Sequence, residues 1–375
     1  MNLSWIHGVQ SGADRSWRAR LLRRCLWVLS LAYGVVVLCR NVAYQTGWLR
    51  TRRLPAFVVS VGNITTGGTG KTPLVGWVVQ ALHALLLSEK PENQPQIAIL
   101  SRGYGATTAG SNDEKAVLDR ICPGVPHLQN RQRARIAAEW LASLLHVPTL
   151  KCPAIVLDDG MQHRQLARDV ELIVIDATHP FGYGYLLPRG MLREPLSQLM
   201  RADWFLVTRS EMVSQQQLSS LREKLLKFVP QDRILEIEFR PSRLINMQGE
   251  TRSLSELESV AYLPFCGIGN PTGFIQLLKH WLPAASAQMK GTLQIFDDHH
   301  HYTPQDLDEL GLLANAHGAR WLLTTMKDLV KIPQASSHGV EFWAVEIAPH
   351  FREGDERLRQ YLKDRYESLN RSLMD

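Results

Sequence analysis

The stretch Gly62–Pro73 contains residues that can hold the phosphates of a nucleotide. It reads GNITTGGTGKTP and ends in the Gly-Lys-Thr of a P-loop. The glycines let backbone N–H groups approach phosphate oxygens, Lys71 can reach the β- and γ-phosphates, and Thr72 can ligate Mg²⁺. The general pattern G-x-x-x-x-G-K-[ST] has a glycine where this chain has Thr65, so a glycine-rich loop that binds nothing is the alternative. The predicted phosphate-binding residues are Thr65, Thr66, Gly67, Gly68, Thr69, Gly70, Lys71 and Thr72.

A second cluster, AIVLDDG, places two carboxylates at the end of an apolar run. A P-loop enzyme needs an acidic anchor for Mg²⁺, and carboxylates at the carboxyl end of a neighbouring strand face the same metal. We therefore expect Thr72, Asp158 and Asp159 to hold Mg²⁺, and the pattern does not choose between the two aspartates. The alternative is a solvated Asp-Gly turn at the end of a strand.

Short apolar runs alternate with helical patterns around these clusters, which is typical of a parallel sheet covered on both faces. The predicted strands are 57–61, 97–100, 154–157, 171–176 and 204–208, and predicted helices include 73–88 and 131–145. The sequence pattern changes past about residue 235, where the segments 234–239 and 242–247 suggest a hairpin. The runs 259–271, 320–328 and 341–347 suggest a second, smaller α/β unit, and a charged helical tail follows from Arg352.

The N-terminal region carries an apolar run, Cys25–Cys39, with arginines on both sides. Fifteen apolar residues fall short of the roughly 20 that a spanning helix needs, so we expect a helix lying in or dipping into an anionic membrane. A buried core helix and a single tilted span are the alternatives. The net charge of +6 agrees with binding to an anionic surface or a phosphorylated substrate, but by itself it does not distinguish these partners from nucleic acid.

The five cysteines are odd in number and show no C-x-x-C spacing, so no disulfide framework or zinc site is expected.

The strand and helix patterns predict an α/β fold class: a P-loop NTPase-type parallel sheet sandwiched by helices, a smaller C-terminal α/β domain and an N-terminal membrane-associated helix. The expected boundaries are 1–53 for the membrane-docking segment, 54–235 for the P-loop core and 236–375 for the C-terminal domain.

Seven blocks in order give the chain a specific resemblance. It resembles the tetraacyldisaccharide 4'-kinase family, the lipid A 4'-kinases of Gram-negative bacteria, from near its N-terminus almost to its C-terminal end. The matching blocks are VGNITTGGTGKTP, LSRGYG, LDDGMQHR, LLPRGMLREP, GIGNP, FDDHHHYT and TTMKDLVK.

The resemblance implies transfer of the γ-phosphoryl of ATP to the 4'-hydroxyl of a tetraacyldisaccharide 1-phosphate, with ATP and Mg²⁺ as cofactors. It also implies work at the cytoplasmic face of the inner membrane, peripheral or monotopic through the N-terminal segment. The partners are then the lipid disaccharide and the membrane surface, with no nucleic acid and no obligate protein partner.

The resemblance further implies a base that activates the acceptor. The family has a carboxylate in a Gly-Asp-Glu-Pro segment, paired with a histidine of the Asp-His-His block. Here that segment corresponds to SNDEKAVL, so Asp113 would be the base and His299 its partner, with Lys71 as the third catalytic residue. A metal site or a surface turn are the other interpretations of the three adjacent histidines, and a solvated acidic loop is the other interpretation of the carboxylates.

Seven further positions match the family less specifically, and a structural hydrogen bond or ion pair is the alternative for each. They are Arg102, Tyr104, Glu114, Gln162, His163, Arg193 and Glu194. The chain departs from the usual pattern at Asn112, Lys115, Met161, Arg189, Met191 and Met326. Of these, Arg189 adds charge near a substrate loop.

Three other function classes compete with a lipid kinase. A switch-type GTPase or an insertion ATPase would need an Asn-Lys-x-Asp loop, which we do not find. A nucleic-acid-binding protein would use the basic surface, but no recognition motif or aromatic–basic stripe is present. A membrane adaptor with a degenerate P-loop would bind ATP without transferring phosphate.

Overall fold

The computed structural model describes residues 8–89, 96–103, 113–144 and 152–374, and the chain forms two compact units. The first unit consists of Met1–Gly103, Gly124–Glu238 and Phe351–Asp375, and the second of Tyr104–Pro123 and Phe239–His350. This division differs from the expected boundaries at two places. The segment with Asp113 belongs to the second unit, and the C-terminal tail belongs to the first.

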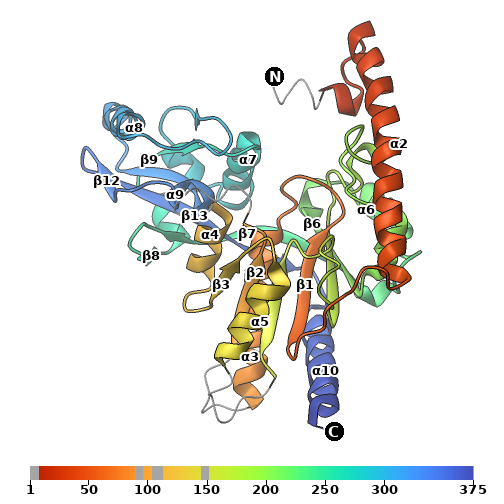
Figure 1. Cartoon of the computed structure of the whole chain (residues 1–375). Coiled ribbons are helices and arrows are strands. Elements are labelled where there is room, and N and C mark those ends of the chain that lie inside the picture. The colour runs from red at the N-terminus through yellow and green to blue at the C-terminus, as the bar shows by residue number, and fades with distance from the viewer. Residues whose placement is uncertain (1–7, 90–95, 104–112, 145–151, 375) are drawn as a thin grey trace. The chain divides into compact units, whose positions relative to one another are not determined.

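Seven parallel strands form the sheet of the first unit (Figure 1). Their order is β3 (His127–Gln129), β2 (Ile97–Ser101), β4 (Ala154–Asp158), β1 (Phe57–Asn63), β5 (Val170–Asp176), β6 (Trp204–Thr208) and β7 (Ile234–Ile245). Every residue of β1, β2, β4, β5 and β6 is buried, as their unbroken apolar sequences predict for a sheet covered on both faces. The predicted α/β class with a mainly parallel sheet is confirmed.

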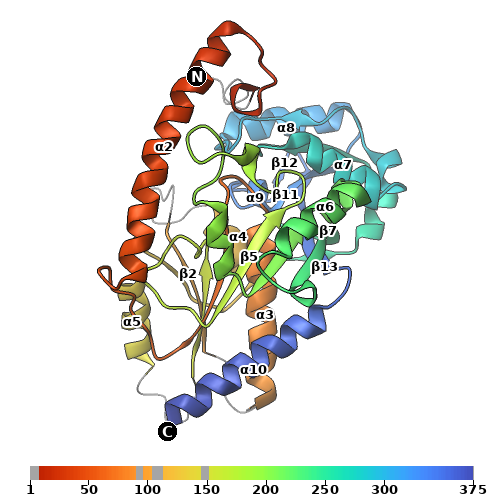
Figure 2. The same ribbon diagram turned by 90° about the vertical axis from the view of Figure 1, so that its right-hand side faces the viewer.

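Helices cover both faces of this sheet. On one face lie α3 (Lys71–Glu89) and α10 (Asp355–Met374), which contact each other and cross in Figure 2. The other face carries α5 (Arg133–Ser143) and α6 (Gln215–Leu225), whose leucines pack on alternate residues of the same strands. The tail returns to the first unit because Tyr366 of α10 packs edge-on against Phe57 and donates to the Cys152 carbonyl at 3.0 Å.

The second unit contains a further set of strands. Its parallel strands lie in the order β10 (Gln294–Ile295), β9 (Tyr262–Cys266), β11 (Trp321–Thr325) and β13 (Val340–Phe351). Two short strands, β8 (Thr251–Arg252) and β12 (Ser336–Ser337), pair antiparallel with β7 and β13. The helices are α4 (Asp113–Ile121), α7 (Pro271–Trp281), α8 (Pro304–Ala316) and α9 (Met326–Leu329).

The hairpin expected across 234–247 is wrong, because Ile234–Ile245 is one continuous strand. The reversal comes later, at Asn246, whose side-chain oxygen accepts from the N–H groups of Gln248 and Glu250 at 3.0 and 2.9 Å. This side-chain turn leads the chain into β8, which pairs with Leu244 and Ile245.

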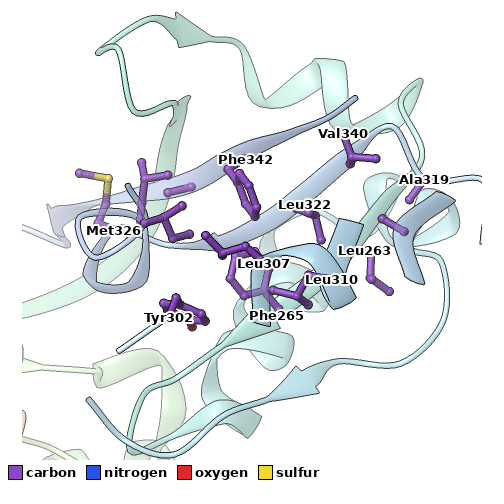
Figure 3. Packing of buried hydrophobic residues seen from close by; sticks show 14 of the residues in the cluster. Leu263, Phe265, Tyr302, Leu307, Leu310, Ala319, Leu322, Met326, Val340 and Phe342 are labelled. Carbon is purple, nitrogen blue, oxygen red and sulfur yellow. The ribbon is translucent and has the colours of Figure 1, made fainter. Parts of the chain in front are cut away.

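A hydrophobic core on one face of the second unit's strands packs against α8, and a separate cluster includes Phe274 and Leu278 of α7. In Figure 3, Leu307 and Leu310 of α8 meet Phe265 and Phe342 of the sheet. Val117 of α4 belongs to the same cluster, so the helix that begins with Asp113 is anchored in this core.

The N-terminal apolar run lies within α2 (Trp17–Gln45), a helix of 29 residues that Ser16 caps by accepting from the Ala19 N–H at 3.2 Å. Its buried residues are Ala19, Ser30, Val37 and Asn41, so a buried core helix is wrong. At 1.5 Å per residue the helix is about 43 Å long. Within the described part of the chain it is the one helix long and apolar enough to cross a membrane. The apolar run alone underestimated this length, because polar residues extend the helix at both ends.

Candidate active site

The loop between β1 and α3 has the geometry of a phosphate cradle. Gly67 and Gly70 have φ of 103° and 81°, a conformation that side-chain-bearing residues rarely adopt, so glycine is needed at both positions. Lys71 begins α3, and its Nζ donates to Asn63 Oδ1 at 3.1 Å. The loop therefore presents a helix N-terminus and a lysine side by side.

Thr65 occupies the position of the missing glycine without needing glycine's freedom. It is 5% exposed and forms an isolated antiparallel bridge with Leu192. The Asn63 side chain donates to the Thr65 carbonyl at 2.7 Å, and the Thr66 N–H donates to the Met191 carbonyl at 2.8 Å. The turn is thus made by Asn63 and by the segment around Leu192, rather than by a first glycine.

Two residues at the end of β6 also support the loop. Thr208 Oγ1 donates to the Thr69 carbonyl at 2.9 Å, and Arg209 Nη2 donates to the Gly68 carbonyl at 2.8 Å. Arg209 also pairs with Asp176 at the end of β5. Sequence reasoning missed Asn63, Thr208 and Arg209; their only signal was their position at the carboxyl ends of strands.

Asp159 lies beside the cradle as an ionised carboxylate. Its Oδ2 accepts from Arg193 Nη1 at 2.6 Å, and its Oδ1 lies 3.5 Å from Lys71 Nζ. Burial alone would raise the pKa of Asp159, but the charges of Lys71 and Arg193 outweigh it and hold that pKa below its usual range. Within the described residues Oδ1 is buried and has no hydrogen-bond partner.

These residues fit a hard cation. Mg²⁺ prefers oxygen ligands, and Asp159 Oδ1, which makes an ion pair with Lys71 but no hydrogen bond within the described residues, offers one next to the cradle. Asp158 ends β4 and is 5% exposed, and Thr72 is the second residue of α3. The three predicted metal-binding residues therefore come from the end of β4, the residue that follows it and the first turn of α3.

Gln162 and His163 form part of the frame around Asp159. The Gln162 amide donates to the Asn63 carbonyl at 2.9 Å and accepts from Arg193 at 3.1 Å. Burial, followed by the charges of Arg133, Arg168 and Arg102, lowers the pKa of His163 from 6.5 to about 4. The His163 imidazole is accordingly neutral at physiological pH.

Glu194 is fully buried, and its two carboxylate oxygens pair with Arg40 of α2 and Arg201 of the 3₁₀ helix Leu196–Arg201. In addition, the Tyr33 hydroxyl of α2 donates to the Arg193 carbonyl at 2.8 Å. The structure places Glu194 in an ion pair with neither oxygen exposed, as the structural alternative expects, while its acceptor role stays a prediction. The pair ties α2 to the segment that carries Arg193.

The remaining accessory positions are placed unevenly. Arg102 is exposed just after β2, and Glu114 is exposed in the first turn of α4. Tyr104 lies outside the described residues. Arg189, the charged departure from the family pattern, stacks over the Tyr185 ring and donates to the Gln10 carbonyl at 2.7 Å.

The second unit brings Asp113 and His299 together, although 186 residues separate them in sequence. His299 Nδ1 lies 3.0 Å from Asp113 Oδ2, and the Asp113 side chain is 20% exposed. The backbone of His299 lies in the left-handed region, with φ of 60°.

The three adjacent histidines do not converge. His300 points away from Asp113, toward Asp306 at 3.0 Å, and packs against Phe296. The described residues contain no group of three His, Cys, Asp or Glu side chains that could hold a metal ion. What the histidine block offers in the second unit is a hydrogen-bonded acid–base pair.

Comparisons with known proteins agree across almost the whole chain. The family model described as tetraacyldisaccharide-1-P 4'-kinase matches residues 22–367. A tetraacyldisaccharide 4'-kinase of Halothermothrix orenii is 32% identical over 91% of this chain and 92% of its own length. One of Chlorobaculum parvum is 35% identical over 88% and 91%. A crystal structure of LpxK from Aquifex aeolicus in complex with ATP superposes with a TM-score of 0.69, at 25% identity, covering 92% of this chain and 99% of that one.

Proposed function

The chain belongs to the tetraacyldisaccharide-1-phosphate 4'-kinase family, and we propose that it transfers the γ-phosphoryl of ATP to the 4'-hydroxyl of a tetraacyldisaccharide 1-phosphate in lipid A biosynthesis. The observation that carries this proposal is the cradle, in which Lys71 and the ionised Asp159 lie 3.5 Å apart at the start of α3. Phosphoryl transfer depends mainly on positioning and charge neutralisation, and this arrangement supplies both.

We assign the phosphates of ATP to the loop Thr65–Gly70, apart from the Thr66 N–H, which already donates to the Met191 carbonyl, and to the side chain of Lys71. Thr72, Asp158 and Asp159 would hold Mg²⁺, which would neutralise charge on the β- and γ-phosphates. On ATP binding, Lys71 would exchange its contacts with Asn63 and Asp159 for phosphate oxygens. Arg193 would keep Asp159 oriented through that exchange, because its 2.6 Å contact is with the other carboxylate oxygen.

Asp113 would act as the base for the acceptor, with His299 orienting its carboxylate. The 4'-oxygen forms a bond to the γ-phosphorus, and the bond from that phosphorus to the β–γ bridging oxygen breaks. ADP leaves with that electron pair, and Asp113 accepts the hydroxyl proton. A positioned base contributes about 10²- to 10⁴-fold to the rate.

We place the enzyme at the cytoplasmic face of the inner membrane through α2. Exposed apolar side chains of this helix include Leu21, Trp27, Val35 and Val36. Arginines border them at both ends, where they would meet anionic head groups. Such docking gives access to an acceptor whose acyl chains lie in the bilayer.

The test is incubation of the full chain with γ-labelled ATP, Mg²⁺ and detergent-dispersed tetraacyldisaccharide 1-phosphate. We expect label on the lipid, lost on Lys71→Ala and retained on Lys227→Ala, because Lys227 is exposed and distant in sequence from the cradle. A reaction without acceptor measures background hydrolysis. Label that appears only as free phosphate, with or without acceptor, would refute the lipid-kinase function.

A further inference from the structure

A buried lysine lies beside the acid–base pair of the second unit. The side chain of Lys331 is only 6% exposed, although lysine is almost never fully buried without a partner. Its Nζ lies 3.0 Å from Asp328 Oδ1 and 4.0 Å from Asp113 Oδ2. Lys331 therefore stands between two carboxylates.

Asp328 holds this lysine in one place. Its carboxylate is fully buried and accepts from the Thr325 hydroxyl at 2.8 Å, while the Asp328 N–H donates back to Thr325 at 3.3 Å. This cap fixes the start of α9. Lys331 also lies 5.6 Å from the centre of the Tyr302 ring, a distance that favours a cation over an aromatic face.

Contacts of α4 and of His299 also fix the position of Asp113. Val117 anchors α4 in the core of the second unit, and Arg120 donates to the carbonyls of Asn246 and Met247 at 3.0 and 3.2 Å. His299 Nδ1 and Lys331 Nζ both face the same oxygen of Asp113, Oδ2. Two nitrogen groups on one oxygen set the rotation of the carboxylate more tightly than a single exposed histidine can.

We propose that Lys331 is a positioning residue for Asp113, with Asp328 as its counter-ion. The inference rests on the proposed role of Asp113 as the base. The positively charged Nζ lies 4.0 Å from the same carboxylate oxygen that contacts His299, so it restricts the rotation of the group that accepts the proton. The competing explanation is structural: Lys331 would only neutralise the buried Asp328.

Steady-state kinetics of the full chain in detergent can separate the two explanations. For Lys331→Met we expect kcat to fall about 10- to 100-fold, less than the whole contribution of a base, with ATP affinity within about twofold of wild type. Lys331→Arg should recover part of kcat, because it restores the charge. Lys279→Met, which alters an exposed lysine of α7, is the matched control and should leave kcat unchanged.

The decisive variant removes both charges. If Lys331 served only Asp328, Lys331→Met combined with Asp328→Asn would restore kcat and stability together, because no uncompensated charge remains. Our inference predicts that this double variant folds but keeps a low kcat. In a second double variant, Lys331→Ala with Asp328→Asn, added ethylamine should raise kcat. Wild-type kcat in the first double variant would overturn the inference while leaving the kinase function intact. Absence of transfer by the wild-type protein would overturn both.

Discussion

Replacement of Glu194 by glutamine should destabilise the first unit before it affects any chemical step. The change keeps the shape of the side chain but removes the negative charge between Arg40 and Arg201. Glutamine can accept from one arginine, but its amide nitrogen then faces the other. Two guanidinium groups would remain close together with no counter-charge.

The structure sets the size of this effect. Glu194 has no exposed surface, whereas the side chains of Arg40 and Arg201 are 36% and 21% exposed. Removing one partner of a fully buried ion pair costs about 3–5 kcal/mol. Water reaches both arginines and screens part of their repulsion, so we expect the lower end of that range, about 3 kcal/mol.

Chemical denaturation of the full chain in detergent, without nucleotide or lipid, measures this cost. Glu223→Gln, an exposed glutamate of α6, is the matched control and should change stability by less than about 0.5 kcal/mol. Because Arg40 and Glu194 are in contact, Arg40→Met with Glu194→Gln should cost less than the sum of the two single changes. Unchanged stability of Glu194→Gln together with a raised KM for the lipid acceptor would refute the structural role and restore Glu194 as an acceptor ligand.

Three further outcomes follow from the site. Asp113→Asn should lower kcat about 10²- to 10⁴-fold with unchanged ATP affinity by equilibrium binding; an unchanged kcat would remove Asp113 as the base. The pKa of His163 is lowered from 6.5 to about 4, so between these pH values the unfolded chain binds a proton that the folded chain does not. The free energy of unfolding should therefore fall by about 2 kcal/mol as the pH drops from 6.5 to 4. Denaturation of His163→Gln should lack that share of the pH dependence, and an equal dependence in both proteins would contradict the assignment. Thr65→Gly, which completes the general P-loop pattern, should not tighten ATP binding and should destabilise by about 1 kcal/mol, because Thr65 is buried; calorimetric titration and thermal unfolding test both parts.

Most of the first unit could be predicted because its signals are local. An unbroken apolar run such as 172–175 favours a buried strand whatever its neighbours are, and the glycines of 67–70 need their backbone freedom within the loop itself. The predicted hairpin across 234–247 failed for the opposite reason. Whether a strand continues or turns there depends on the pairing of its second half with β8, and that pairing is set by the side chain of Asn246.

Some features of the site could likewise be predicted from local sequence, and others could not. By itself, the sequence determined the phosphate cradle, the acidic pair at the end of β4 and, through its resemblance, the family. Tertiary structure alone brought Lys331 into line with Asp113 and His299, and enclosed Glu194 between two arginines. The reason is physical: a backbone conformation is selected by neighbours along the chain, whereas burial and charge pairing are decided by residues that only the folded chain brings within a few ångströms.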